Sequence, residues 1–450
     1  MAWRRRTSRW LVANPIRLLP VAFGSLIALG TALLLLPVSK ADGQKVGVVD
    51  ALFTATSAVC VTGLTVVDTA TAWSGFGQAV IALLIQLGGL GIVTLVSVAL
   101  LLVSDRIGIT HARALAAEIG TDTRAGIKEL VRGIVVTTLI VELVFAVVLA
   151  LRFHFAHDFD VWTSVWHGLF HSVSAWNNAG FALYSDGLMQ FASDWFVLVT
   201  ISVAVIFGGL GFPVLRTIVL NRLDWSRWTL HAKLTVTTTI VLLVVGFLAF
   251  AGFEWTNPET LGALSHPDRI SGSFFLSVQP RTAGFNAVDT AVLTEESIVV
   301  SVILMFIGGG SASTAGGIKV TTFALLAFVM WAQIRGDRDV TMFRRRVPES
   351  AQRLSLTVAL AGVGVLTVST LALMAIGDSG TAKSAFEAVS ALSTVGLSSG
   401  VTAEQDAVGR ILLTVLMFVG RLGPVTLATA VILRSRPHLF RHPVDQPLIG

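Results

Sequence analysis

The sequence predicts an all-α membrane protein assembled from four parallel copies of one helix–loop–helix unit. Three observations predict this class. Of the 450 residues, 54% are hydrophobic and 13% are charged, whereas a soluble domain carries about 25% charged residues. Apolar runs of about 18 or more residues, each long enough to cross a bilayer as a helix, recur along the whole chain. These runs fall into four successive pairs, and a short glycine-containing segment lies between the two runs of each pair.

The apolar runs predict about eight spans. Each should be a helix, because lipid requires a spanning segment to pair its own backbone polar groups. Their expected ranges are 17–38, 76–103, 130–152, 191–220, 232–253, 296–330, 354–376 and 407–433. The first run follows a cluster of arginines and is too long for the apolar core of a signal peptide, so we interpret it as a membrane helix. The single cysteine, Cys60, excludes an intrachain disulfide and a cysteine-based zinc or redox site.

Between these runs lie segments that are too short and too polar at their ends to span a membrane. They are near 50–66, 162–182, 270–286 and 383–398. Each indicates a short amphipathic helix and a glycine turn, with a serine about six residues before the glycine. A long period that carries two spans and a re-entrant loop indicates internal duplication. Two spans per copy keep all copies parallel, and the expected repeats are 1–110, 111–225, 226–340 and 341–450.

Basic residues in the short loops predict the orientation. The N-terminus and the segments 104–132, 216–233, 335–353 and 434–441 hold about 23 of the 32 Lys and Arg residues. The opposite loops, which also hold the glycine segments, are acidic. The positive-inside rule therefore predicts a multi-pass protein of the cell (plasma, or inner) membrane, with both termini cytoplasmic and the glycine segments entering from outside. The formal charge of +5 does not indicate nucleic-acid binding, because the basic residues follow the membrane topology.

The glycine segments suit the passage of a cation. Rings of backbone carbonyls replace the water shell of an ion, and the loop needs a residue without Cβ at its sharpest point. The short helices before the loops aim partially negative C-terminal ends at the ion. The alternative is four packing glycines of the kind common in membrane helices, but four matching contexts favour a filter. The expected ion-binding apices are Val61, Thr62 and Gly63; Asn178, Ala179 and Gly180; Thr282, Ala283 and Gly284; and Thr394, Val395 and Gly396.

The fourth apex, Thr394-Val395-Gly396-Leu397, resembles the Thr-Val-Gly-Tyr core of potassium-channel filters. The degenerate set of four is similar to the Trk/Ktr/HKT superfamily of potassium transporters, and most like its KtrB membrane subunits, over nearly the whole chain. The resemblance implies helix–pore loop–helix repeats around a central ion pore that takes up potassium. Gly63, in place of serine, implies potassium over sodium. The resemblance also implies a homodimer of pore subunits on a cytosolic ring of nucleotide-binding, KtrA/TrkA-like regulatory subunits.

The sixth expected span is interrupted by a glycine-rich segment, 308–317, which we call the glycine loop. Five glycines in ten residues oppose a helix, since each costs about 0.5–1 kcal/mol relative to alanine. The resemblance implies an intramembrane gate below the filter. The alternatives are a packing kink and a phosphate-binding loop, but the latter lacks a preceding strand and a Gly-Lys-Ser/Thr ending. The expected gate residues are Gly308, Gly309, Gly310, Ser311, Ser313, Thr314, Gly316, Gly317 and Arg421.

Two arginines lie at membrane depth. Arg421 is flanked by apolar residues in the last span, and such a charge marks a pathway or a partner. The resemblance implies that it projects into the pore, and we expect it to bind backbone or hydroxyl oxygens of the glycine loop. The alternative partner is Glu142. Arg281, beside the third apex, is expected to form a salt bridge with an acidic residue of an outer loop.

Other functions remain as alternatives. A secondary cation symporter with a midplane site usually shows inverted repeats or paired broken helices, whereas we expect parallel repeats and one broken span. A sodium-permeable member of the same family and a non-conducting membrane scaffold are further alternatives. No nucleophile–base motif indicates an enzyme. The sequence leaves open whether sodium stimulates transport and which nucleotide the partner binds. The short loops and tail contain no regulatory domain, so we expect control by another chain.

Overall fold

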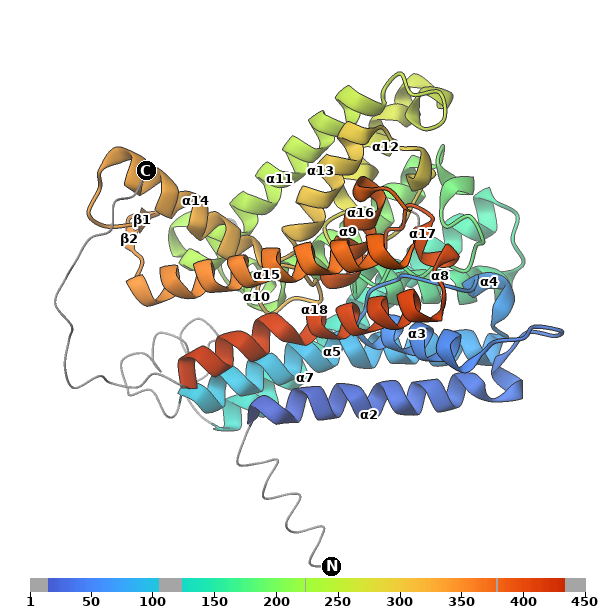
Figure 1. Cartoon of the computed structure of the whole chain (residues 1–450), viewed down its shortest axis with the longest axis horizontal. Coiled ribbons are helices and arrows are strands. Elements are labelled where there is room, and N and C mark those ends of the chain that lie inside the picture. The colour runs from blue at the N-terminus through green and yellow to red at the C-terminus, as the bar shows by residue number, and fades with distance from the viewer. Residues whose placement is uncertain (1–14, 105–123, 223, 378, 434–450) are drawn as a thin grey trace, which may run out of the picture.

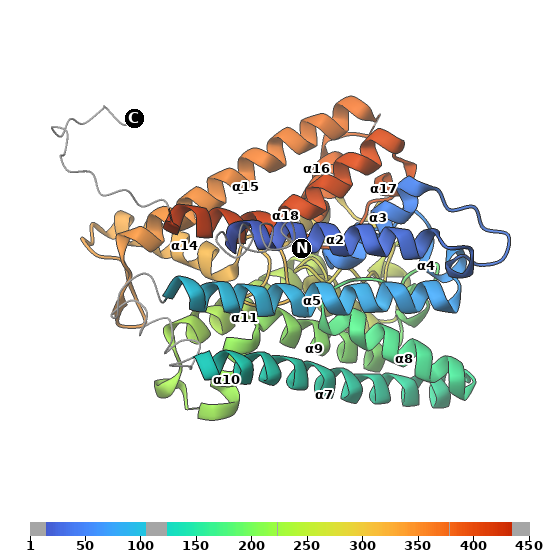
Figure 2. The ribbon, with the colours of Figure 1, turned by 90° about the horizontal axis from the view of Figure 1, so that it is seen from below.

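Long helices, most of them running close to the longest axis of the molecule, surround four shorter ones (Figures 1 and 2). The computed structural model describes residues 15–104, 124–222, 224–377 and 379–433. The long helices and their segments are α2 (Pro15–Leu35), α5 (Gly75–Ser104), α7 (Arg124–Ala156), α9 (Trp195–Leu210), α10 (Phe212–Asn221), α11 (Leu230–Glu254), α13 (Glu295–Phe306), α14 (Val320–Arg335), α15 (Glu349–Ile376) and α18 (Ala407–Leu433).

The four short helices fall in the four expected glycine segments. They are α3 (Val48–Val59), α8 (Val161–Trp176), α12 (His266–Val278) and α16 (Thr381–Leu392). Each follows one long helix in the chain and precedes another, and polar residues begin some of them: Asp160 accepts a hydrogen bond from Thr163 N at 3.0 Å in α8. The expected fold class, an all-α membrane protein of parallel helix–pore loop–helix repeats, is confirmed.

The long helices include spans that are continuous and spans that are interrupted. Among the described residues, Val131–Ala156, Leu230–Glu254 and Glu349–Ile376 are individually long and apolar enough to cross a membrane. The pair α9–α10 meets the same criteria only together, and it is bent by 98°. The expectation of one continuous helix over 191–220 is therefore wrong. Gly211 separates the two helices at φ +90°, and α10 starts afresh with a proline in its first turn.

Shorter elements connect the long helices at the two ends of the bundle. They are α4 (Thr69–Ala72), α17 (Val401–Glu404), the 3₁₀ turns at Pro37–Ser39, Met189–Phe191, Trp225–Arg227, Leu261–Ala263 and Thr290–Val292, and the antiparallel strands β1 (Thr341–Met342) and β2 (Arg345–Arg346). Figure 1 places the β1–β2 hairpin at one end of the long axis and α4 and α17 toward the other. The arginine-rich hairpin and the predicted outer loops are therefore separated, as the expected topology requires.

In three of the four repeats a glycine lets the short helix press its C-terminal end against the following long helix. The last residue of each short helix offers its carbonyl to this glycine, and there is no space for a side chain between them. A Cβ built on the glycine would lie 2.0 Å from the oxygen for Gly88 and Val59, 2.0 Å for Gly208 and Trp176, and 1.7 Å for Gly420 and Leu392. Small residues at such contacts allow the close helix packing that membrane proteins rely on.

Candidate ion pathway

The four apices follow one backbone course although their sequences differ. The residue two positions before each glycine has positive φ: 56° at Val61, 60° at Asn178, 69° at Thr282 and 50° at Thr394. The glycines follow with φ of 93°, 68°, 77° and 102° in chain order. Valine and threonine rarely adopt positive φ, at a cost of about 1–3 kcal/mol, and persist there only where the surroundings hold them. The repeated strain therefore identifies four structurally equivalent sites.

The apex glycines form a closed ring. Each faces the backbone oxygen of the residue that precedes the next glycine along the chain, and the last glycine faces the first apex. A Cβ built on the glycine would lie 2.3 Å from the oxygen for Gly63 and Ala179, 2.8 Å for Gly180 and Ala283, 2.3 Å for Gly284 and Val395, and 2.2 Å for Gly396 and Thr62. The four loops therefore surround one axis, and any side chain at these positions would collide with a neighbouring backbone.

Hydrogen bonds from the short helices hold the apices. Ser57 Oγ accepts from Gly63 N at 3.1 Å, and Ser390 Oγ accepts from Gly396 N at 3.2 Å. Ser174 lies at the same position and donates instead to Phe181 O at 2.8 Å. The predicted serine six residues before a glycine thus has a defined role in three repeats.

The third repeat departs from this pattern. Ser277 precedes its glycine by seven residues and donates to Leu243 O on α11 at 2.7 Å. Gln279 supports the apex instead, since its Oε1 accepts from Phe285 N at 3.1 Å. The helix α12 also ends six residues before its glycine, whereas the other three end four before, and Pro280 follows at this early end. Proline has no N–H to continue the helix, so the third loop takes a different path into the same apex.

The glycine loop leaves and re-enters the helical region at one point. Ile307 and Ile318 form a parallel bridge, in which Gly308 N donates to Ile318 O at 2.9 Å and Ile318 N donates to Phe306 O at 3.1 Å. The segment between them is an excursion whose ends lie together. Its position between α13 and α14 agrees with the predicted break in the span 296–330.

The tip of the glycine loop lies against two apices. Thr314 Oγ1 donates to Asn178 Oδ1 at 3.0 Å, and a Cβ built on Gly316 would lie 2.0 Å from Thr394 Oγ1. Both partners precede an apex glycine by two residues, so the loop lies on the side of the ring where the short helices end. Four buried polar atoms of the apices have no hydrogen-bond partner among the described residues: Thr62 Oγ1, Asn178 Nδ2, Thr282 Oγ1 and Thr394 Oγ1.

Arg421 contacts the glycine loop as expected. Its side chain is buried, and Nη1 donates to Thr314 O at 2.6 Å. The alternative partner Glu142 is wrong, because that carboxylate accepts from Gln86 Nε2 at 3.0 Å and Asn177 Nδ2 at 2.9 Å. The guanidinium therefore faces backbone oxygen rather than a carboxylate, and no ion pair involving Arg421 occurs in the part of the chain that the structure describes.

The expected outer salt bridge of Arg281 is also wrong. The side chain is buried and turns inward, donating to Thr239 O at 3.2 Å and Gly308 O at 3.3 Å. It thereby joins the third apex to the first residue of the glycine loop. Two guanidinium groups, from Arg281 and Arg421, thus hold the loop by its carbonyls at Gly308 and Thr314.

The bend between α9 and α10 receives the glycine loop. Gly310 N donates to Gly209 O at 2.8 Å, and a Cβ on Gly211 would lie 2.8 Å from Ser311 O. Sequence reasoning missed this second break. The signal was present, because Gly208, Gly209 and Gly211 precede Pro213 in the same combination of small residues and proline that ends helices elsewhere.

A helical membrane fold with four re-entrant loops around one axis is the architecture of a transport protein rather than an enzyme. The family model TrkH, described as a cation transport protein, matches residues 12–440. The chain therefore belongs to the TrkH family of cation transport proteins.

Individual relatives agree with this membership. The chain is 38% identical to Ktr system potassium uptake protein B of Vibrio alginolyticus, with 96% of this chain and 94% of the relative covered. It is 33% identical to potassium/sodium uptake protein NtpJ of Enterococcus hirae, with 97% of each covered. The crystal structure of the potassium transporter TrkH from Vibrio parahaemolyticus matches with a TM-score of 0.73 at 20% identity, covering 93% of this chain and 84% of that one. The resemblance to KtrB-type subunits is confirmed, and the structural match shows the shared fold.

Proposed function

We propose that the chain mediates potassium uptake across the cell membrane through a selectivity filter made by the four apices. The observation that carries this proposal is the closed ring in which each apex glycine faces a backbone oxygen of the next repeat. An ion that leaves its water shell needs such a ring of oxygens around a single axis. The repeat boundaries at 110, 225 and 340 belong to the same proposal, with one filter loop in each repeat.

The local backbone suits ion binding. Positive φ two residues before each glycine and again at the glycine alternates the handedness of the chain, which turns successive carbonyls toward one side of the loop. The C-terminal ends of α3, α8, α12 and α16 precede the apices and contribute partial negative charge. The buried hydroxyls of Thr62, Thr282 and Thr394 offer further oxygens, while Val61 and Asn178 break the four-fold equivalence.

The choice of potassium rests on the relatives and on the first apex. Ktr system potassium uptake protein B of Bacillus subtilis, 38% identical over 93% of this chain, has potassium in its name, and NtpJ has potassium and sodium. Gly63 leaves its position without a side chain, and a serine there would place a hydroxyl among the carbonyls. A sodium-permeable pore, or potassium uptake that sodium stimulates, is the alternative within the family.

The glycine loop and Arg421 form the proposed gate. The loop lies against the apices on the side where the short helices end, and the buried guanidinium adds a fixed positive charge beside it. A cation passing at about 4 Å would be repelled by roughly 4 kcal/mol at an effective dielectric of about 20. Such a barrier slows passage by several hundred-fold, since each 1.36 kcal/mol is about tenfold in rate. Displacing the loop therefore changes flux without altering the filter.

Partners and orientation complete the proposal. The chain forms a homodimer of pore subunits in the plasma membrane, with both termini cytoplasmic, and binds a cytosolic ring of nucleotide-binding, KtrA/TrkA-like subunits. The phrase "Ktr system" in the names of two relatives supports a multicomponent assembly. The regulatory ring would act on the glycine loop through the cytoplasmic ends of the helices that carry it.

A coupled cation symporter is the second candidate. The sequence predicted one broken span, and the bend between α9 and α10 adds a second, which favours this candidate. Discontinuous helices commonly surround midplane substrate sites, and here two spans are interrupted. The two breaks contact each other below the apices, however, and do not form the ring of glycines. The ring surrounds a separate axis, which a pore requires and a midplane site between broken helices does not. Uptake driven by voltage alone, without a co-ion gradient, distinguishes the channel-like pathway from coupled transport.

Uptake of potassium or rubidium in cells that lack potassium transport tests the filter. Wild-type protein should restore uptake, and Gly396→Asp should abolish it, because the Cβ would fall 2.2 Å from Thr62 O. Gly63→Ser should lower the discrimination against sodium, because its Cβ would lie 2.3 Å from Ala179 O and force that carbonyl to shift out of the ring. Gly75→Asp at the start of α5, where a Cβ meets nothing within 4 Å and the carboxylate lies at a helix N-terminus, controls for the added charge. Normal uptake by correctly inserted Gly396→Asp protein would show that the ring is not the ion pathway.

A further inference from the structure

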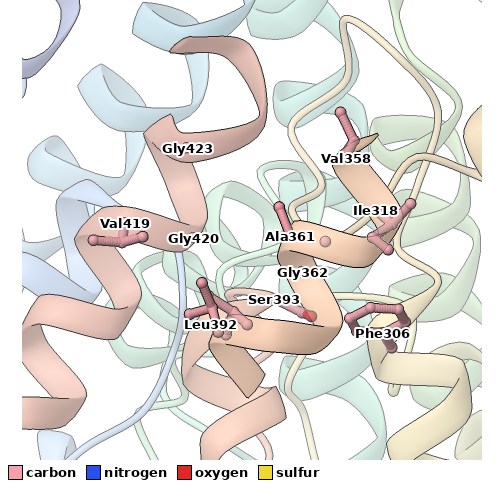
Figure 3. Close-up of a pocket in the computed structure, with 12 residues that line it drawn as sticks. Phe306, Ile318, Val358, Ala361, Gly362, Leu392, Ser393, Val419, Gly420 and Gly423 are labelled. Atoms are coloured by element: carbon pink, nitrogen blue, oxygen red, sulfur yellow. The ribbon is translucent and has the colours of Figure 1, made fainter. Parts of the chain in front are cut away.

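An apolar cavity beside the glycine loop has no role in the pathway described above. It has a volume of about 210 Å³ and lies where α15 and α18 approach the end of α13. Figure 3 shows Phe306 and Ile318 on one side of the cavity and Leu392 and Val419 on the other. Its lining contains no charged residue, and Ser393 is its one hydroxyl side chain. The cavity is therefore suited to hydrocarbon and not to an ion or a headgroup.

The floor and the mouth of the cavity differ in exposure. The floor is buried and includes Gly317 and Ile318, the last residue of the glycine loop and its neighbour. The mouth is exposed, with Val365 on α15 at 37% and Val419 on α18 at 40%. A group that enters from the surface therefore reaches the end of the glycine loop directly.

The mouth opens at the middle of the membrane. Gly362 has 13 residues of α15 before it and 14 after it, and Gly420 has 13 residues of α18 on each side. At 1.5 Å per residue, both lie about 20 Å from the helix ends, within the roughly 30 Å of hydrocarbon in a bilayer. The medium at the mouth is therefore lipid tails rather than water or headgroups.

We propose that this cavity binds one acyl chain of a membrane lipid, which packs against Gly317 and Ile318. An apolar cavity of about 150 Å³ already binds benzene, so the volume here takes a segment of a chain, whereas a helix of about 10 Å diameter cannot enter. A second apolar cavity, of about 520 Å³, lies between α13, α14 and α15 and shares Phe306 and Ile318 with the first. This second cavity gives the rest of the acyl chain an apolar route along α15.

The bound acyl chain should restrain the glycine loop, an inference that rests on the proposed gate. Gly317 and Ile318, at the end of the glycine loop, also form part of the floor of the cavity, so a movement of the loop away from the apices that carries these two residues displaces the floor. An acyl chain that fills the cavity opposes this displacement and holds the loop below the filter. The lipid is thus a negative regulator of flux.

Photolabelling tests the site. The full chain is reconstituted in phosphatidylcholine vesicles that contain a phosphatidylcholine with a diazirine at the middle of one acyl chain, and labelled peptides are identified by mass spectrometry. We expect labelling at Ile318 and at 358–365. Ala361→Phe, which fills the cavity from α15, should lower labelling at Ile318 at least fivefold. Val358→Phe repeats the test from the same lining should the first variant not insert.

Gly364→Phe is the matched control, because Gly364 lies on the same helix and a Cβ there meets nothing within 4 Å. Labelling at Ile318 that persists in both filled variants, or that falls equally in the control, overturns the site. Potassium uptake then tests the regulation: the phenyl ring of Ala361→Phe occupies the cavity permanently, as the acyl chain does only while bound, and should lower maximal uptake about threefold relative to Gly364→Phe. Reduced labelling with unchanged uptake would support the lipid site but refute the inference that the bound acyl chain restrains the glycine loop. The labelling result does not depend on whether the glycine loop is a gate.

Discussion

Among the described residues, two spans are interrupted, and the two interruptions differ in kind. The pair α9–α10 breaks at the single residue Gly211 and resumes as a helix at a bend of 98°. The pair α13–α14 breaks over 307–319, and most of that segment is an excursion closed by a bridge at its base. Each break frees backbone groups that lipid cannot pair, and the two breaks pair some of them with each other through Gly310 N and Gly209 O.

The difference indicates separate roles. The bend presents carbonyls and contacts no apex through a hydrogen bond found among the described residues, so it acts as a platform. The glycine loop rests on this platform and contacts two apices and two arginines by side chains and carbonyls. Changes at the bend should therefore damage the fold, whereas changes in the loop should alter flux in a folded protein.

The largest effect is expected for Gly211→Ala. The residue has φ +90°, which L residues rarely adopt, and the new Cβ would lie 2.8 Å from Ser311 O. Backbone strain alone costs about 1–3 kcal/mol. We expect lower thermal stability in detergent and less than a tenth of wild-type uptake. Gly252→Ala on α11, where a Cβ meets nothing within 4 Å, should behave as wild type. A Gly211→Ala protein as stable as this control would remove the platform role.

An intermediate effect is expected for Arg281→Gln. The substitution removes the contacts with Thr239 and Gly308 that join the third apex to the glycine loop. We expect uptake without the regulatory partner to rise about three- to tenfold, with little change in the potassium concentration for half-maximal rate. Arg281→Lys keeps the charge but loses the planar guanidinium, so its uptake without the partner should lie between those of wild type and Arg281→Gln. Partner dependence that is equal in wild type and Arg281→Gln would show that this contact does not restrain the loop.

The smallest effect is expected where the loop touches its own helix. Ser311 Oγ and Thr321 Oγ1 lie 3.1 Å apart, and such a hydrogen bond contributes about 0.5–1.5 kcal/mol. Ser311→Ala and Thr321→Val should each raise uptake without the partner by only about twofold, the lower end of that range, and the double variant should add little to either. Additive effects in this cycle would mean that the two hydroxyls act independently.

Much of the fold could be predicted because it depends on features that recur along the chain. Long apolar runs located the spans, and glycines in matching contexts located the four apices. The break at Gly211 was missed because glycines and prolines are common in membrane helices, so the cluster of Gly208, Gly209 and Gly211 before Pro213 does not by itself locate a break. The support from Gln279, in place of a serine, depends on the early end of α12.

The contacts of the glycine loop were less predictable. Its composition identified it, but Thr314 meets Asn178 across 136 positions of sequence, a pairing that depends on how the repeats close into a ring. Arg281 was predicted to form a salt bridge with an acidic residue of an outer loop, because a charged side chain in a membrane protein usually pairs with an opposite charge. The guanidinium instead turns inward, where it donates to the carbonyl of Gly308 in the broken span and to that of Thr239 on α11.

Deletion of residues 309–315 tests the central claim most directly. The base of the excursion stays intact, since Gly308 and Gly316 already lie together: a Cβ on Gly308 would fall 2.0 Å from Gly316 O. The deletion removes the contacts of Thr314 with Asn178 and Arg421. Potassium uptake by this variant, at equal amounts in the membrane, should show a higher maximal rate, unchanged apparent affinity and weaker dependence on the regulatory partner. An inserted deletion variant with an unchanged or lower maximal rate would contradict the gate and make the loop a packing element.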